Sequence, residues 1–194
     1  MQRFAPSVLC LQETQVGGLR ARNLAFSFGF SRCYTVGSNG RSGGLAIYWN
    51  DDLLLELIHY SQYHIDMIVK KNGEEPWRLT NIYGEATVSE RQKTWDLLRF
   101  LRSESELPWV CIGDYNEVLS PEEHFGVGER CARQMTGFKE AVDVAGLCDL
   151  GFVGPIWTFE TKVRGGTFTR VRLDRALALP SWMTRFPTAT VRHL

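Results

Sequence analysis

Short runs of apolar residues, separated by turn-forming residues, make up most of the chain. Such runs are typical of β-strands, and glycine, asparagine and aspartate at their ends favour tight turns. Asn50-Asp51-Asp52 and Lys71-Asn72-Gly73 are two such turn signals, and they predict antiparallel hairpins. The predicted strands are Ser7–Glu13, Cys33–Val36, Leu45–Trp49, Leu53–His59, residues 65–69, Trp77–Tyr83, Pro108–Ile112, Ile156–Glu160 and Arg170–Ala176.

Three segments carry apolar residues at helical spacing instead. They are residues 19–28, 89–101 and 133–145. The second begins with Ser89 and Gln92, which match a capping box, and the third stops before a glycine, which favours helix termination. Helices that interrupt runs of antiparallel strands predict an α+β fold, with the helices outside sheets that pack face to face.

Size and composition are those of an ordinary globular protein. The chain has 194 residues and a mass of 22.1 kDa, which suits one domain over residues 1–194. Lys+Arg and Asp+Glu both number 22, so the net charge is zero. This balance argues against tight non-specific binding to nucleic acid but allows a transient contact through local cations. The odd number of cysteines, 5, predicts a reduced, intracellular protein, and no apolar run is long enough to cross a membrane.

Polar side chains end two of the apolar runs. Gly113-Asp114-Tyr115-Asn116 follows one of them, and Glu13 ends another. In an extended segment Asp114 and Asn116 point to the same side, and their oxygens suit a hard cation such as Mg²⁺. The alternatives are a Gly-Asp-x-Asn turn and a solvated strand end. Together the residues predict phosphodiester chemistry, in which a carboxylate holds water or metal and an amide donates to a phosphate oxygen.

Two further residues have both a functional and a structural interpretation. Tyr83 ends an apolar strand, where its hydroxyl either faces water or binds a phosphate oxygen. Asp174 lies between apolar neighbours, and it either pairs with Arg172 or Arg175 or orients a histidine. Most of the 4 histidines are predicted to lie at the surface, and no Cys/His spacing indicates zinc.

A set of segments in a fixed order covers almost the whole chain. The segments are Leu11–Thr14, Gly40–Ala46, Trp77–Gly84, Ser89–Leu98, Pro108–Glu117, Gly146–Phe152, Gly154-Pro155, Leu173–Leu177, Ser181-Trp182 and Phe186-Pro187. In this order they resemble the endonuclease/exonuclease/phosphatase family. The resemblance is strongest to the apurinic-type endonuclease domain of plant LINE-type (non-LTR) retrotransposons.

The resemblance implies a fold, a reaction and roles for particular residues. The fold is a DNase I-like α+β sandwich of two sheets flanked by helices, and the reaction is cleavage of a DNA phosphodiester with Mg²⁺, or with Mn²⁺. Glu13 corresponds to the metal carboxylate, and Asp114 binds the metal or holds the attacking water. Asn116 stabilises the phosphorane, Tyr83 contacts the scissile phosphate, and Asp174 orients a histidine.

The resemblance also implies partners and a location. DNA is the transient substrate, a reverse transcriptase domain accompanies the endonuclease in the full polyprotein, and the protein is intracellular and nuclear. Four cations in loops or at strand starts near glycine pairs are expected to face the DNA, the alternative for each being a solvated surface charge. They are Arg41, Lys162, Arg164 and Arg170.

Both ends of the family pattern are missing from the sequence. The family has an Asn-bearing strand before the Leu11–Thr14 segment, and a Ser-Asp-His motif after a segment like residues 191–194. We therefore expect a truncated domain that lacks the first and last strands and is weakly active or inactive. Losing a general base or an electrostatic partner lowers the rate roughly 10²–10⁴-fold. The alternatives are another phosphoesterase of the same fold and a non-catalytic remnant or interaction module.

Overall fold

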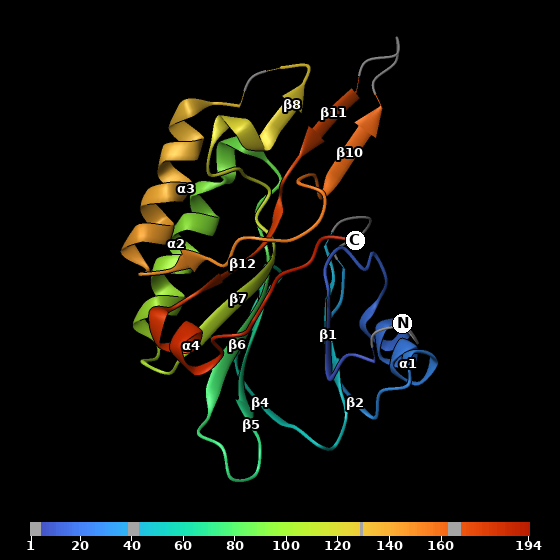
Figure 1. The fold of residues 1–194 in the computed structure, drawn as a ribbon. Coiled ribbons are helices and arrows are strands. Elements are labelled where there is room, and N and C mark those ends of the chain that lie inside the picture. The colour runs from blue at the N-terminus through green and yellow to red at the C-terminus, as the bar shows by residue number, and fades with distance from the viewer. Residues whose placement is uncertain (1–4, 39–42, 129, 163–167) are drawn as a thin grey trace. The chain divides into compact units, whose positions relative to one another are not determined.

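The computed structural model describes residues 5–38, 43–128, 130–162 and 168–194 (Figure 1). The chain forms two compact units, Met1–Tyr83 and Gly84–Leu194. Both contain antiparallel strands joined by short turns, as the apolar runs predict.

The first unit begins with a three-stranded sheet. Its order is β1 (Val8–Leu11), β3 (Leu45–Trp49) and β2 (Arg32–Val36), and both pairings are antiparallel. Helix α1 (Gly18–Phe28) lies beside β2 and ends at Gly29, whose φ of 82° suits a residue without a side chain. These elements match the predicted strands and the predicted helix over residues 19–28.

A second group of strands in the same unit consists of β4 (Leu54–Tyr60), β5 (His64–Lys70) and β6 (Trp77–Tyr83). They pair in that order, and β3 packs against β5 and β6, so two sheets face each other within this unit. Asn81 joins the two sheets, because its buried amide donates to Leu11 O at 3.1 Å and to Ala46 O at 3.3 Å.

The second unit has its own central strands and most of the helices. Strand β12 (Asp174–Ala178) pairs with β7 (Trp109–Asp114) on one side and with β9 (Cys148–Asp149) on the other. Helices α2 (Gln92–Ser103) and α3 (Ala132–Val144) pack side by side, and α4 (Pro180–Arg185) contacts β7 (Figure 1). Trp95 of α2 stacks on Phe138 of α3 with ring centroids 4.8 Å apart.

A smaller sheet completes the second unit. Strand β11 (Phe168–Val171) lies between β10 (Phe159–Lys162) and β8 (His124–Gly126). Short 3₁₀ turns occupy Val88–Glu90 and Pro121–Glu123.

Three predicted boundaries differ from the structure. The capping box is wrong, because α2 starts at Gln92 and the Gln92 amide donates to Asp96 Oδ1 at 2.9 Å. The predicted strand Arg170–Ala176 is broken into β11 and β12, because the backbone N–H of Arg172 donates to Glu123 O as the chain passes from one sheet to the next. The predicted strand at Ile156–Glu160 starts later, at Phe159.

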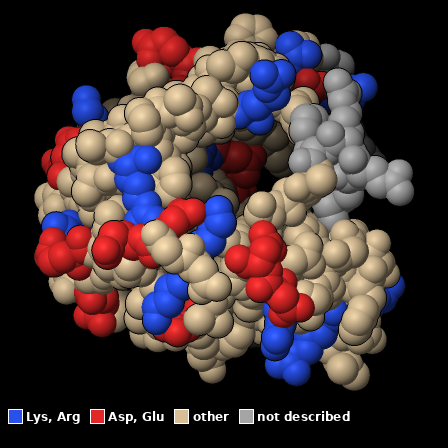
Figure 2. Space-filling model, turned by 60° about the horizontal axis from the view of Figure 1, so that its bottom comes forward, with Lys and Arg blue, Asp and Glu red and all other residues tan. Residues whose placement is uncertain are grey.

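The distribution of surface charge and the state of the cysteines agree with the composition. Cationic and anionic side chains are interspersed over the face shown in Figure 2, as a net charge of zero suggests. All five cysteines are free thiols, and burial raises the pKa of Cys10 to about 12. Among the helices of the described ranges, none combines the length and apolar character needed to span a membrane.

Candidate active site

Two carboxylates face each other where β7 ends and β12 begins. The register of the two strands places Asp114 directly opposite Asp174. Side chains in such a cross-strand pair have Cβ atoms about 4.5–5.5 Å apart, and like charges in these positions destabilise the sheet. The structure therefore brings together two of the predicted site residues, in an arrangement that favours a nearby cation.

The turn after β7 positions Asn116. Asp114 Oδ1 accepts the backbone N–H of Asn116 at 2.7 Å, and Asn116 has a left-handed φ of 54°. The side-chain amide of Asn116 donates to Gly84 O at 2.7 Å. The expectation of an extended segment through Asn116 is thus wrong, and the turn alternative describes the backbone correctly. The turn still holds the Asn116 amide close to the Asp114 carboxylate.

Gly84 makes this turn possible by close packing. Its backbone N–H donates to Asp114 O at 2.6 Å. A Cβ at this position would lie 2.3 Å from Tyr115 O, closer than real Cβ contacts allow. The glycine in the Trp77–Gly84 segment is therefore needed for the backbone of the Asp114 turn to approach it.

Asp174 is held by its backbone. The N–H groups of Leu173 and Asp174 donate to Thr158 Oγ1 at 2.9 and 3.0 Å. The suggested pairing of Asp174 with Arg172 or Arg175 is wrong, because both arginines bind Glu123 and Asp149 instead. Among the described residues, no histidine is hydrogen-bonded to Asp174.

Glu13 and Tyr83 meet within the first unit. Glu13 follows β1, and the Tyr83 hydroxyl at the end of β6 donates to Glu13 Oε1. Glu13 has a φ of 48°, which is unfavourable for a residue with a long side chain and is common at functional sites. The structure thus joins two more of the predicted residues, and backbone strain marks one of them.

A glycine also fixes the chain next to Glu13. The backbone N–H of Thr14 donates to Gly44 O at 3.1 Å, and that of Gln15 donates to Gly43 O at 3.1 Å. A Cβ on Gly44 would lie 2.3 Å from Thr14 Oγ1. The Gly40–Ala46 segment, described from residue 43, therefore supports the strained backbone around Glu13.

The four predicted DNA-facing cations divide into two groups. Lys162 and Arg170 lie on paired strands β10 and β11, and Lys162 is exposed. Arg170 Nε binds Glu160 Oε2 at 2.6 Å, and its guanidinium lies over the Phe168 ring. Arg41 and Arg164 lie outside the described residues.

Two histidines make defined side-chain contacts in the structure. His64 is an exception to the surface position predicted for most of the histidines, because it is 1% exposed and bonds His59 and Ser61 at 2.8 Å. His193 Nδ1 lies 2.8 Å from Pro155 O, and its ring stacks on Phe152. A buried histidine next to a turn carries no distinctive sequence signal, because Ser61 and His64 also suit a solvated turn.

The donor chemistry in each unit suits a divalent cation. Asp114 and Asp174 in the second unit, and Glu13 in the first, offer carboxylate oxygens, the ligands that Mg²⁺ prefers. Within the residues that the structure describes, no group of three or more His, Cys, Asp or Glu side chains is arranged so that it could hold a metal ion. Mg²⁺ commonly binds through one or two carboxylates and keeps several waters, so a smaller donor set is compatible with it.

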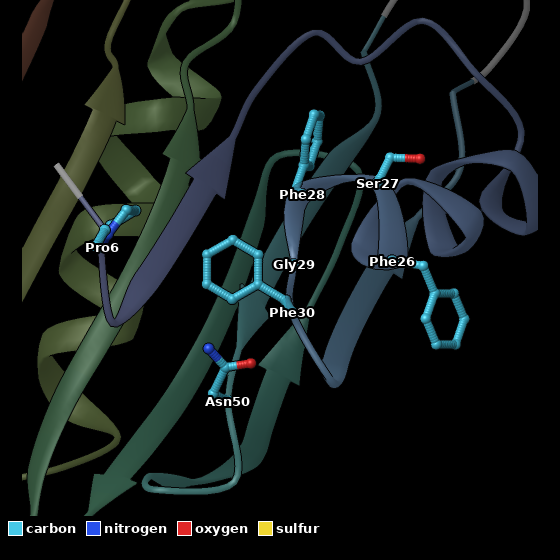
Figure 3. A pocket seen from close by; sticks show the side chains of 8 residues that line it. Pro6, Phe26, Ser27, Phe28, Gly29, Phe30 and Asn50 are labelled. Carbon is cyan, nitrogen blue, oxygen red and sulfur yellow. The ribbon is translucent and has the colours of Figure 1, made fainter. Parts of the chain in front are cut away.

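The first unit also contains a pocket of about 440 Å³ that lies away from Glu13. Figure 3 shows Phe30 and Asn50 facing the pocket, while Phe26 points away from them. Pro6 lines the pocket just before β1, whereas Glu13 lies beyond the other end of this strand. A strand rises about 3.3 Å per residue, which separates the two positions by roughly 20 Å.

Comparisons with known proteins agree on the family and the fold. The sequence profile described as "Endonuclease/Exonuclease/phosphatase family" matches residues 1–188. No curated protein is significantly similar to the chain in sequence.

Three solved structures are similar to the chain. The endonuclease domain of TRAS1, a telomere-specific non-LTR retrotransposon, is 15% identical, with a TM-score of 0.62 over 92% of this chain and 88% of that chain. The 3′ phosphatase NExo from Neisseria, bound to a product DNA hairpin, is 19% identical, with a TM-score of 0.64 over 93% and 79%. An AP endonuclease from Archaeoglobus fulgidus is 19% identical, with a TM-score of 0.65 over 92% and 78%. These matches confirm the predicted α+β fold with two sheets flanked by helices.

Proposed function

Because the chain belongs to the Endonuclease/Exonuclease/phosphatase family, we propose that it hydrolyses phosphodiester bonds in DNA with the help of Mg²⁺ or Mn²⁺. The observation that carries this proposal is the cross-strand pair of Asp114 and Asp174, with the Asn116 amide held beside it. Facing carboxylates reduce the stability of a sheet, and such an arrangement is typical of sites that bind cations or move protons.

Asp114 and Asn116 supply complementary functions in this proposal. The Asp114 carboxylate positions the attacking water and accepts its proton. The Asn116 side chain has two N–H donors, one of which binds Gly84 O, so the second is able to donate to a phosphate oxygen. A neutral amide stabilises developing negative charge on the phosphate without repelling it.

Glu13 and Tyr83 form the other part of the catalytic set. The Tyr83 hydroxyl donates its single proton to Glu13 Oε1, which leaves Oε2 of the carboxylate for a cation. A contact from Tyr83 to the scissile phosphate requires this proton to turn away from Glu13. Glu13 and Asp114 are the proposed ligands of the metal, which when bound neutralises charge on the phosphate. Asp174 is the proposed positioning residue beside Asp114.

Nicking of supercoiled plasmid tests the proposal. Wild type is compared, with Mg²⁺ and with EDTA, to Asp114→Ala and to the matched control Asp96→Ala, which removes an exposed carboxylate from α2. We expect weak nicking that EDTA abolishes, that Asp114→Ala lowers roughly 10²–10⁴-fold and that Asp96→Ala leaves unchanged. A folded wild-type protein without Mg²⁺-dependent nicking would contradict DNA hydrolysis.

The same assay measures how active the chain is. A rate close to those of intact nucleases would overturn the sequence-based expectation of weak activity or inactivity. Hydrolysis of a phosphodiester dye without DNA nicking would instead favour another phosphoesterase of this fold. Failure of Mg²⁺ to change the thermal stability would favour a non-catalytic interaction module.

We further propose that the chain derives from a plant LINE-type retrotransposon and acts beside a reverse transcriptase domain in the nucleus. The ordered motifs of the sequence and the similarity to the TRAS1 domain support this origin. Identification of the full transcript, with or without a reverse transcriptase reading frame, tests the proposal directly.

A further inference from the structure

Arg130 is a partly buried arginine next to the Asp114 turn. Its Nη1 donates to the backbone oxygen of Asn116 at 3.4 Å and lies 3.7 Å from Glu117 Oε1. Only 20% of its side chain is exposed. No sequence motif indicated this residue, because its position beside the turn follows from tertiary contacts.

The charge around Arg130 is incompletely balanced. Glu117 is fully buried and already binds Arg91 Nη1 through Oε2, while Oε1 accepts the backbone N–H of Val118 at 2.9 Å. Two guanidinium groups therefore share one carboxylate, and Glu117 is the only carboxylate within ion-pair distance of Arg130 in the described ranges. Burial lowers the pKa of Arg130, an effect that Glu117 and Asp114 oppose and Arg91 strengthens. Arg130 therefore has only a shared, long ion pair with Glu117, which leaves its guanidinium able to bind a further anion.

A pocket gives this charge access to a ligand. It has a volume of about 300 Å³ and is lined by Pro121, His124, Gly128, Arg130 and Met135. The guanidinium and the imidazole provide hydrogen-bond donors, while Met135 and Pro121 provide an apolar wall. An anion with an attached apolar body, such as a sugar phosphate, matches this combination.

We propose that Arg130 and His124 form a subsite for a DNA backbone phosphate adjacent to the phosphate that is cleaved. This inference rests on the proposed function. The contact between Arg130 and the Asn116 carbonyl places the subsite beside the Asp114 turn. Each strand of DNA carries one phosphate per about 3.4 Å of helix axis, so a neighbouring phosphate lies within reach of such a site. A planar guanidinium binds phosphate through two parallel hydrogen bonds, which fixes the strand as well as attracting it.

The test measures DNA binding without cleavage. A fluorescein-labelled DNA duplex is titrated with protein in EDTA between about 50 and 200 mM KCl, and fluorescence anisotropy gives the Kd. Wild type is compared with Arg130→Met, Arg130→Lys and the control Arg102→Met, which removes a cation paired with Glu106 on the surface. We expect Arg130→Met to weaken binding about tenfold and to reduce the slope of log K against log salt by about one. Arg130→Lys restores the slope, and Arg102→Met leaves both quantities unchanged.

His124→Gln decides the matter if Arg130→Met is found unfolded by circular dichroism. It removes the imidazole from the same pocket, and we expect a loss of affinity with little change in slope, because a neutral imidazole contributes no charge. Unchanged affinity in folded Arg130→Met overturns the subsite. If Arg130→Met does not fold, unchanged affinity in folded His124→Gln overturns it. If wild type still nicks plasmid in that case, the proposed function stands. A wild-type protein that neither binds nor nicks DNA refutes both.

Discussion

Two acidic clusters meet at the start of β12, and they differ in what neutralises them. Glu123 and Asp149 bind Arg172 and Arg175 through four ion pairs of 2.7–2.9 Å. Arg172 and Arg175 are almost fully buried. One residue away, Asp174 lies opposite Asp114, and within the described ranges Asp174 has no arginine or lysine within ion-pair distance. The same short segment thus supplies cations to one acidic cluster and a second anion to the other.

The difference separates a structural cluster from a functional one. Buried and partly buried carboxylates that are matched by buried guanidinium groups hold segments together, here the loop at Glu123 and the strand at Asp149. Facing carboxylates lower stability and persist where a cation, a proton or a substrate uses them. We therefore assign the Asp114–Asp174 pair to chemistry and the arginine network to its support.

Loss of Arg175 should give the largest effect. In Arg175→Met, the buried Glu123 and the partly buried Asp149 keep their negative charge with one cation fewer. We expect the free energy of unfolding to fall by about 3–5 kcal/mol, measured by urea denaturation. The exposed control Arg102→Met should be nearly neutral. A fall of less than about 1 kcal/mol in Arg175→Met would mean that the network is not the stabilising element.

His64 provides a buried group that is kept neutral rather than paired with an opposite charge. Burial, and next the neighbouring His59, lower the pKa of His64 to about 4 from its ordinary 6.5. Because the pKa of His64 is lower in the folded than in the unfolded protein, the contribution of His64 to the free energy of unfolding is fully present above pH 6.5. This contribution is lost as the pH falls towards 4. The loss approaches about 3 kcal/mol at pH 4.

Thermal unfolding between pH 7.5 and 4.5 measures this loss. His64→Gln should remove the pH dependence in the upper part of this range, and His124→Gln should keep it. Glu123 and Asp149 add little pH dependence of stability in the upper part of this range, because their pKa values are lowered from their ordinary acidic values. A flat profile for wild type between pH 7 and 5 would contradict a buried, neutral His64.

Magnesium should stabilise the facing pair and not the matched network. A site with a Kd of about 1 mM raises the unfolding free energy by about 1.4 kcal/mol at 10 mM Mg²⁺. We expect this increase in wild type and in Asp96→Asn, and its loss in Asp114→Asn, by differential scanning fluorimetry. An increase that survives in Asp114→Asn would place the cation elsewhere.

Neutralising one member of the pair should have the smallest effect, with the opposite sign. Asp174→Asn removes the repulsion from Asp114, so we expect a gain of about 0.2–1 kcal/mol in metal-free buffer. Urea denaturation in EDTA measures the change. A clear loss of stability would show that the Asp174 carboxylate has a stabilising partner, and the comparison between the two clusters would fail.

Local patterns in the sequence predict most elements of the fold. Apolar runs bounded by Gly, Asn and Asp give the strands, because turn residues and side-chain alternation act over a few positions. The capping box at Ser89 fails for a tertiary reason, since Arg91, two residues further on, binds the buried Glu117 and the helix begins after it. The alternation in residues 65–69 likewise does not reveal that Asp66 is buried and bonded to Arg78.

The candidate site is only partly predictable for the same reason. Glu13, Asp114 and Asn116 stand out because polar groups end apolar strands, and this signal is local. The pairing of Asp114 with Asp174 depends on the register of two strands far apart in the sequence. Arg130 has no local signal, because its role follows from the burial of Glu117 and from the turn at Asn116.

The most direct test asks which acidic cluster attracts a divalent cation. Mn²⁺ prefers the same oxygen ligands as Mg²⁺ and broadens nearby amide signals in ¹H–¹⁵N NMR spectra. At low Mn²⁺ concentration, we predict that the signals of Asp114, Asn116 and Asp174 broaden first, and that Asp114→Asn removes this selectivity. Broadening that starts at Glu123 and Asp149, or that is uniform over the protein, would contradict the assignment of the facing carboxylates to a cation-dependent site.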